Sequence, residues 1–174
     1  MSTVKILFLA ISLLFGTMAT SPTGTTQKPE KKGGLTWYTL KKAQQLAKKN
    51  NKKVLIFAEA SWCPYCKKMK REVFPKTDIQ NTMEKFYYPV KIDIESEKTV
   101  AYKGKKMTKK QFSREMRVSA TPTFIFMRPS GSVIGTQPGF IEQHVYKALL
   151  TYIGTDSFKD VGFKKYMKRI KTEH

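Results

Sequence analysis

Apolar and polar positions follow two different rhythms along the chain. Short runs rich in β-branched and aromatic residues have the alternating or continuous apolar character of strands. Longer segments repeat apolar residues every three or four positions, as amphipathic helices do. This pattern predicts strands at 54–58, 88–94, 124–127 and 133–136, and helices at 36–50, 63–74, 78–85, 108–116, 141–152 and 156–170.

Capping and helix-breaking residues mark several of these boundaries. Thr36 and Thr108 are predicted N-caps. Pro75 interrupts one helix because it cannot donate a backbone N–H, and Gly154 ends another. Residues 95–107 are polar and rich in lysine, which predicts a loop. The order of elements predicts an α/β fold, with a central mixed β-sheet flanked by helices and an extra C-terminal helix.

The first 34 residues do not share this pattern. A short basic start, an apolar run at 6–15 and small residues up to Ala19 are typical of a secretory signal peptide over residues 1–19. An uncleaved anchor is the alternative. Residues 20–34 are rich in Thr, Pro, Gly and Lys and are predicted to be a flexible linker before a domain at 35–174. Either reading predicts a periplasmic or otherwise exported domain.

Length and composition predict one domain with a real core, since 40% of the 174 residues are hydrophobic and 26% are charged. The chain has 33 Lys and Arg against 13 Asp and Glu, a net charge of +20. Such a charge can indicate nucleic-acid binding. The lysines are dispersed rather than gathered in a strip with aromatic residues, so we expect no nucleic acid as a partner. Weak attraction to anionic surfaces is the preferred interpretation.

Both cysteines of the chain lie in Trp62-Cys63-Pro64-Tyr65-Cys66, where a predicted strand gives way to a predicted helix. Cys63 is therefore placed at a helix N-terminus, whose free N–H groups and positive dipole end stabilise a thiolate. Thiols in such motifs have pKa values of roughly 3.5 to 7.5, against about 8.5 for free cysteine. We therefore expect Cys63 to be a nucleophile and Cys66, one turn further on, to be the resolving thiol.

Other interpretations of the cysteine pair fit the residues less well. A structural zinc site needs about four ligands, and the remaining candidates, His144 and His174, lie far downstream. Covalent haem needs a histidine after the second cysteine, where Lys67 stands. A purely structural disulfide would close a very short loop and contribute little stability. Redox chemistry is the strongest interpretation, and we expect neither a metal nor another cofactor.

Residues 35–153 resemble the thioredoxin family at two motifs, the Trp62-Cys63-Pro64-Tyr65-Cys66 segment and Thr121-Pro122-Thr123 before an apolar strand. The resemblance implies that Pro122 is cis and faces the cysteines, while the backbone at Thr121 pairs with a bound substrate chain. An edge-strand proline is the alternative. The resemblance to thioredoxins also implies that Trp62, Pro64 and Tyr65 support the site. Trp62 is expected to shield the disulfide, and Tyr65 to tune the pKa of the thiolate.

The chain departs from the family at one position. Cytoplasmic thioredoxins carry a buried aspartate six residues before the first cysteine, where this sequence has Phe57. The nearest acid is Glu59, which becomes a candidate proton shuttle. The alternative is a partly exposed residue at a strand end. His144, on the late helix, is expected to lie at the surface.

Within the family, the signal peptide, the long loop and the helical tail most resemble exported SoxW-like thiol:disulfide oxidoreductases. This implies a reductase of exported protein disulfides that takes electrons from a membrane thiol reductase of the DsbD or CcdA type. The Pro-Tyr dipeptide between the cysteines also resembles glutaredoxins and the isomerase DsbG. A disulfide oxidase or isomerase, and a chaperone-like peptide-binding module, therefore remain alternatives, because the residues do not determine the direction of electron flow.

Overall fold

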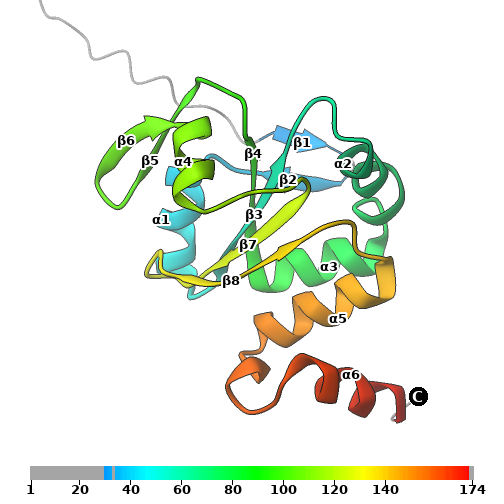
Figure 1. Ribbon diagram of the computed structural model, residues 1–174. Helices are drawn as coiled ribbons and strands as arrows, with labels where there is room; N and C mark the ends of the chain where they lie inside the picture. Colours follow the sequence, from blue (N-terminus) through cyan, green and yellow to red (C-terminus); the bar gives the residue numbers. More distant parts are fainter. Residues whose placement is uncertain (1–29, 33, 173–174) are drawn as a thin grey trace, which may run out of the picture.

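The computed structural model describes residues 30–32 and 34–172, and its centre is a four-stranded sheet with the strand order β4-β3-β7-β8 (Figure 1). Strand β3 (Lys53–Glu59) runs parallel to β4 (Tyr87–Asp93) and antiparallel to β7 (Thr123–Met127). The edge strand β8 (Val133–Pro138) pairs antiparallel with β7. The predicted mixed sheet is therefore confirmed.

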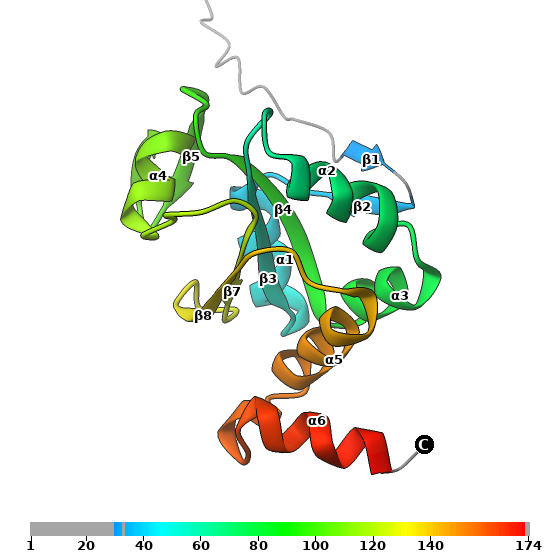
Figure 2. The ribbon, with the colours of Figure 1, turned by 45° about the vertical axis from the view of Figure 1, so that its right-hand side comes forward.

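Helices cover both faces of this sheet, as predicted (Figures 1 and 2). The two faces bury separate apolar clusters, because side chains alternate between the faces of a strand. Leu55 and Phe57 of β3 belong to one cluster, and Val54 and Ile56 to the other. The first face is covered by α2 (Pro64–Lys68), α3 (Thr77–Phe86) and α5 (Gln143–Gly154), and the second by α1 (Leu40–Asn50) and α4 (Lys109–Glu115).

Helix α2 continues as a π-helical turn at Met69–Val73. The backbone N–H of Phe74 donates to the carbonyl of Met69 at 3.0 Å, five residues earlier, which is the bonding of a π-turn. Pro75 follows, and α3 then begins at Thr77. The predicted interruption at Pro75 is confirmed. The segment buries Cys66, Met69 and Val73 on one side, which holds it against the sheet.

The N-terminal boundary differs from the prediction. Thr36 does not cap a helix, because Leu35–Trp37 form strand β2, which pairs antiparallel with β1 (Glu30–Lys32). The segment forms a strand because its side chains alternate between core and surface, and Leu35 and Trp37, two positions apart, are both buried in the core. The N-cap of α1 is Thr39, whose hydroxyl accepts from the Lys42 N–H.

The last part of the predicted linker over 20–34 thus contains strand β1. The predicted signal peptide over 1–19 lies outside the described residues, and so does the linker up to residue 29.

The predicted loop over 95–107 is also wrong in part. It contains the hairpin of β5 (Thr99–Tyr102) and β6 (Lys105–Thr108). Lys103 and Gly104 make its two-residue turn with positive φ angles of 48° and 77°, as the right-handed twist of a hairpin favours. Tyr102 anchors the hairpin, because its buried hydroxyl donates to the Gly131 carbonyl at 3.2 Å. Thr108 caps α4, as predicted.

The C-terminal tail consists of a 3₁₀ turn, Ser157–Lys159, and the helix α6 (Phe163–Thr172), rather than one continuous helix over 156–170. Figure 2 shows α6 lying along α5, beyond the sheet. The Tyr152 ring of α5 lies 5.2 Å from the ring of Phe163 and 5.1 Å from that of Tyr166. Aromatic packing therefore attaches the tail to the domain.

Candidate active site

The cysteine motif lies where β3 ends and α2 begins. Cys63 is the N-cap residue of α2, in an extended backbone conformation, and its sulfur accepts from the backbone N–H of Cys66 at 3.0 Å. Pro64 occupies the first turn, where its missing N–H costs no hydrogen bond. The local sequence thus places one sulfur at the positive end of a helical segment.

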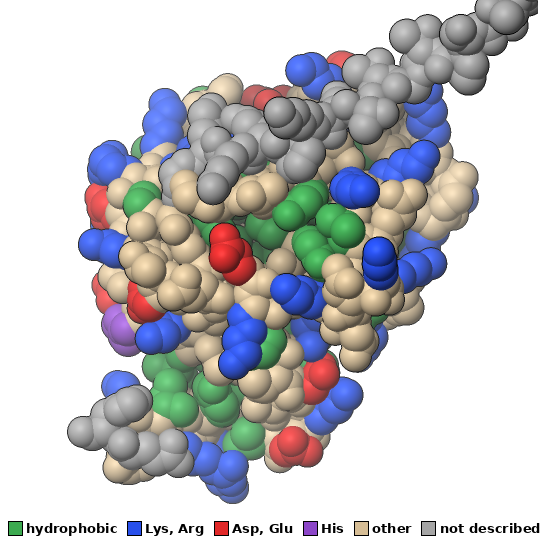
Figure 3. Space-filling model, turned by 180° about the vertical axis from the view of Figure 1, so that it is seen from behind, with side chains coloured by type: hydrophobic (Ala, Val, Ile, Leu, Met, Phe, Trp, Pro, Cys, Tyr) green, Lys and Arg blue, Asp and Glu red, His purple; other side chains and the backbone are tan. Residues whose placement is uncertain are grey.

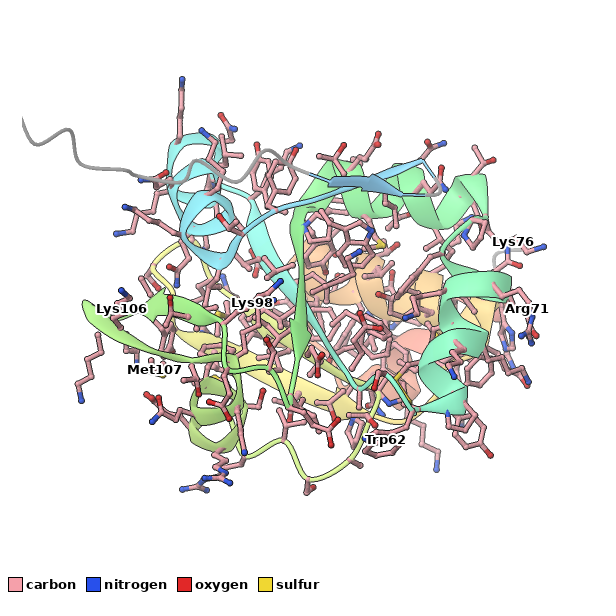
Figure 4. All side chains as sticks on the ribbon, turned by 90° about the horizontal axis from the view of Figure 1, so that it is seen from above. Trp62, Arg71, Lys76, Lys98, Lys106 and Met107 are labelled. Carbon is pink, nitrogen blue, oxygen red and sulfur yellow. A yellow bond between two sulfur atoms is a disulfide. The ribbon has the colours of Figure 1, made fainter. Side chains whose placement is uncertain are left out.

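Cys63 and Cys66 are joined by a disulfide, with Cα atoms 5.3 Å apart. Both residues are buried, whereas their neighbours Trp62 and Tyr65 are 60% and 57% exposed. Tyr and Trp are enriched at the surfaces through which proteins bind partners. Trp62 lies at the margin of the molecule in the view from above (Figure 4). The motif therefore combines a buried disulfide with exposed aromatic surface on either side.

The segment before β7 lies at the same end of the sheet as the cysteines. Thr123 pairs with Ala58 of β3, so Pro122 lies beside the end of β3 from which the chain enters the cysteine turn. The Thr121–Pro122 peptide bond is cis, the isomer that the resemblance implies. Pro122 is buried, and its carbonyl accepts from the Gly139 N–H at 2.8 Å. The buried Thr121 hydroxyl has no hydrogen-bond partner among the described residues.

An aromatic layer that includes Phe57 lies beneath the motif. Phe57 is 1% exposed, and its ring centroid lies 5.0 Å from that of Phe74 and 5.5 Å from that of Phe124. Tyr146 of α5 completes the layer, with its ring 4.8 Å from that of Phe124. Burial raises the pKa of Tyr146 well above its ordinary value, so its hydroxyl stays protonated. We name these four residues the aromatic layer.

Glu59 is the last residue of β3 and faces the same side of the sheet as Phe57, because it is two positions further on. Its carboxylate forms an ion pair with Lys70 of the π-turn at 2.6 Å. The side chain is 16% exposed, so the charge is mostly shielded from water. Glu59 therefore ties the end of β3 to the helical segment that carries the cysteines.

Further charged groups lie close to Glu59. Asp93, the last residue of β4, pairs with Glu59 in the parallel register. Partial burial lowers the pKa of Lys109 at the start of α4, and the neighbouring carboxylates of Asp93 and Glu59 oppose that shift. The carboxyl ends of β3 and β4 therefore carry a small mixed-charge cluster beside the redox pair.

Sequence reasoning missed Phe140, which follows β8. Its ring centroid lies 6.3 Å from that of Tyr65, and the Lys68 ammonium lies 4.5 Å above its face. No local signal identifies this residue, because only the packing of the β8–α5 connection brings it to the motif. His144 is exposed on α5, with Glu142 as its nearest ionic partner at 3.7 Å.

The described residues form neither a metal-binding cluster nor a membrane-spanning helix. Among residues 30–32 and 34–172, His, Cys, Asp and Glu side chains nowhere gather in threes that could hold a metal ion. In the same part of the chain, no helix has the length and apolar character needed to cross a membrane.

Comparison with known proteins assigns the family. A family model described as a thioredoxin-like domain matches residues 40–154. A thioredoxin-fold protein from Helicobacter pylori is 20% identical, with a TM-score of 0.66, and the match covers 72% of this chain and 88% of that chain. No curated protein matches the chain.

Two further solved structures share the fold. A thioredoxin from Thermus thermophilus is 22% identical, with a TM-score of 0.55, over 67% of this chain and 85% of that chain. The oxidoreductase DsbH is 16% identical, with a TM-score of 0.54, over 69% of this chain and 83% of that chain. The chain therefore belongs to the family of thioredoxin-like domains, and its Cys63–Cys66 pair makes it a thiol:disulfide oxidoreductase.

Proposed function

We propose that the protein reduces disulfides of exported proteins by thiol–disulfide exchange. The observation that carries this proposal is the position of the Cys63 sulfur, at the start of a helical segment, where it accepts from the Cys66 N–H. The same donor and the helix dipole stabilise a thiolate at Cys63 once the disulfide is reduced. Cys66 lies inside the first turn of α2 rather than at its N-cap, so it is assigned as the resolving thiol.

The reaction follows from these two roles. The Cys63 thiolate attacks one sulfur of a partner disulfide, a mixed disulfide forms, and the other partner sulfur leaves as a thiolate. Cys66 then loses its proton and attacks the Cys63 sulfur, which releases the second partner thiolate. Two electrons pass to the partner, and Cys63–Cys66 becomes the disulfide present in this structure.

The substrate-binding surface consists of groups around the disulfide. Trp62, Tyr65 and Phe140 offer aromatic surface to an extended partner chain. The backbone of Thr121, held by the cis bond to Pro122, provides hydrogen bonds to that chain. The buried Thr121 hydroxyl has no partner among the described residues, so it is the candidate donor for the Cys63 thiolate in the reduced protein.

Glu59 is the proposed proton carrier for the Cys66 thiol. The aromatic layer leaves no acid at position 57, and Glu59 lies on the same face of β3, two residues closer to the motif. Its ion pair with Lys70 orients the carboxylate towards the helical segment of Cys66. A general base must lie within hydrogen-bond reach of its proton, directly or through one water.

The direction and the location of the reaction rest on other observations. The N-terminal sequence pattern supports export, and export places the domain where partner disulfides persist. The resemblance to SoxW-like proteins supports a membrane reductase of the DsbD or CcdA type as the electron donor. A disulfide oxidase or isomerase would use the same residues with the opposite or no net electron flow.

Insulin reduction with dithiothreitol as the electron source tests the catalytic roles. We expect Cys63→Ala to abolish turnover, and Cys66→Ala to accumulate mixed disulfides that are visible on non-reducing gels. Undiminished turnover by Cys63→Ala would refute the proposal. A peptide-binding module would bind unfolded chains equally well without either cysteine.

The reduction potential of the Cys63–Cys66 pair tests the direction. A potential well below about −200 mV supports a reductase, whereas one near −120 mV indicates an oxidant. Equilibration with glutathione, followed by alkylation of the free thiols, measures this value. The same alkylation at varied pH determines whether the Cys63 thiol ionises below the ordinary pKa of cysteine.

A further inference from the structure

The helix α6 has the highest share of Lys and Arg of the helices that the structure describes. Five of its ten residues are Lys or Arg, and none is acidic. All five are exposed, and no ion pair joins them to another described residue. They are Lys164, Lys165, Lys168, Arg169 and Lys171. The helix thus presents a concentrated positive charge that the domain itself does not neutralise.

The opposite side of α6 is apolar and only partly covered. Phe163, Tyr166, Met167 and Ile170 follow the spacing of one helix face. The first two pack on Tyr152, whereas Met167 and Ile170 do not belong to either core cluster and remain partly exposed. Figure 3 shows hydrophobic side chains among lysines and arginines at the lower end of the molecule, which α5 and α6 form.

This end lies away from the disulfide. Figures 1 and 2 agree in placing α6 at the bottom of the molecule and α2, which begins at the cysteines, near the top. A large partner seated on α6 would therefore leave Trp62 and Tyr65 free for substrates. The two surfaces can be occupied at the same time.

We propose that α6 docks the protein on an anionic lipid surface. A basic helix with a narrow apolar face lies in the plane of such a surface, with its lysines among the headgroups and its apolar side chains in the interface. Each Lys or Arg near an anionic bilayer strengthens binding several-fold at physiological salt. The five basic residues of this short helix therefore contribute more to the binding free energy than the insertion of Met167 and Ile170 does. Charge complementarity thus selects lipid headgroups as the occupant.

Docking would hold the protein at the membrane while the disulfide faces the surrounding compartment. The inference does not depend on the direction of electron flow. It also makes no use of Cys63 or Cys66, so it can fail while the proposed function stands.

Vesicle co-sedimentation of the protein without residues 1–19 tests this docking. We expect binding to vesicles that contain phosphatidylglycerol, no binding to pure phosphatidylcholine, and loss of binding at about 1 M salt, where the Debye length is about 3 Å. Changing Lys164, Lys165, Lys168 and Lys171 together to Gln should weaken binding by more than about tenfold. Insulin reduction by this variant should stay unchanged, which shows that the fold is intact.

A matched variant separates docking through α6 from net charge. Changing the exposed Lys41, Lys42, Lys48 and Lys49 of α1 to Gln removes the same charge elsewhere. Equal losses in the two variants would overturn the proposal, and so would no binding of the unaltered protein. Binding to polyglutamate as tight as to vesicles, with the same dependence on the α6 lysines, would identify an acidic protein partner and also overturn it.

Discussion

The two ends of the molecule differ in how far aromatic side chains are exposed and in whether buried polar groups are hydrogen-bonded. At the disulfide end, Trp62 and Tyr65 stay exposed, while the buried Thr121 hydroxyl has no partner among the described residues. The buried Tyr146 hydroxyl, in the aromatic layer beneath the motif, also has no partner among the described residues. At the α5–α6 end, two buried polar groups are paired with backbone carbonyls. The Tyr87 hydroxyl donates to Leu150 at 2.6 Å, and the Lys53 ammonium donates to Gly154 at 2.9 Å. The α5–α6 end thus has internal hydrogen bonds that stabilise the fold, whereas the disulfide end exposes aromatic surface.

The difference has a physical reason. An exposed apolar side chain or an unpaired hydroxyl costs stability unless a ligand covers it or bonds to it. The proposed function accounts for the exposed aromatic groups at the disulfide end, because a partner chain bound there would cover Trp62 and Tyr65 during exchange. Satisfied polar groups at the other end, and the apolar core between the two ends, supply the stability that offsets this cost.

The largest effect on stability is expected from Phe57→Asp, which places the aspartate of cytoplasmic thioredoxins in the aromatic layer. Phe57→Asp should lower the free energy of unfolding by about 4 kcal/mol or more, because it removes a buried ring and buries a carboxyl. Burial raises the pKa of that carboxyl in the folded state above the unfolded value of about 3.9. The variant should therefore lose further stability as the pH rises from about 4 to 7. Urea denaturation at several pH values measures this.

The apolar change Phe57→Leu, which removes part of the ring volume but buries no charge, serves as the control for that experiment. It should cost clearly less than Phe57→Asp, about 1 to 2 kcal/mol, and show no added pH dependence. A stable Phe57→Asp variant would mean that the aromatic layer tolerates charge, and the contrast between the ends would then lose its basis.

Removing the Lys53 ammonium at the α5–α6 end should have the next largest effect on the free energy of unfolding. Lys53 is 8% exposed, and its ammonium lies 3.3 Å from the Asp156 carboxylate as well as donating to Gly154. Lys53→Met should cost about 2 kcal/mol, since it leaves a carbonyl without its donor. Thermal unfolding followed by circular dichroism gives the value. The exposed Lys49→Met should change stability by less than about 0.5 kcal/mol, and equal effects would contradict the assigned role of Lys53.

Substitution of the exposed aromatic surface at the disulfide end should lower activity but leave stability nearly unchanged. Trp62→Ala should lower kcat/KM for a protein disulfide by about tenfold, through loss of contacts made at the centre of the interface. Its effect on stability should stay within about 0.5 kcal/mol, because the ring is mostly exposed. Turnover of a small disulfide such as oxidised glutathione should fall far less. A large loss of stability would show that Trp62 is a structural residue.

Glu59→Gln should change both stability and turnover only modestly. The Lys70 side chain of its ion pair is 44% exposed, so solvent screening limits the loss to less than about 1 kcal/mol. The resolution of a mixed disulfide should nevertheless slow at neutral pH and recover at high pH, where the Cys66 thiol ionises without help. Stopped-flow measurement of product release over a pH series shows this. Glu72→Gln, which removes another acid paired with a lysine, should leave the profile unchanged.

Local pattern was enough to predict most of the fold. The strand before the cysteines, the interruption at Pro75 and the cap at Thr108 depend on neighbouring residues alone, and the structure has all three. Two errors arose where tertiary contacts decide between helix, loop and strand. Residues 35–37 are a strand because Leu35 and Trp37 reach the core, and Tyr102 holds the hairpin through a bond to distant Gly131.

The sequence by itself determined the chemistry of this protein, because a nucleophilic sulfur and its resolving partner lie three residues apart in one motif. Only the tertiary structure decided what surrounds them. The contact of Phe140 with Tyr65 joins segments that are distant in sequence. The unpaired Thr121 hydroxyl, the Glu59–Lys70 ion pair and the packing of α6 on Tyr152 depend on how whole strands and helices pack. Such contacts form only when the sheet brings strand ends and connections together, and no short-range pattern encodes that meeting.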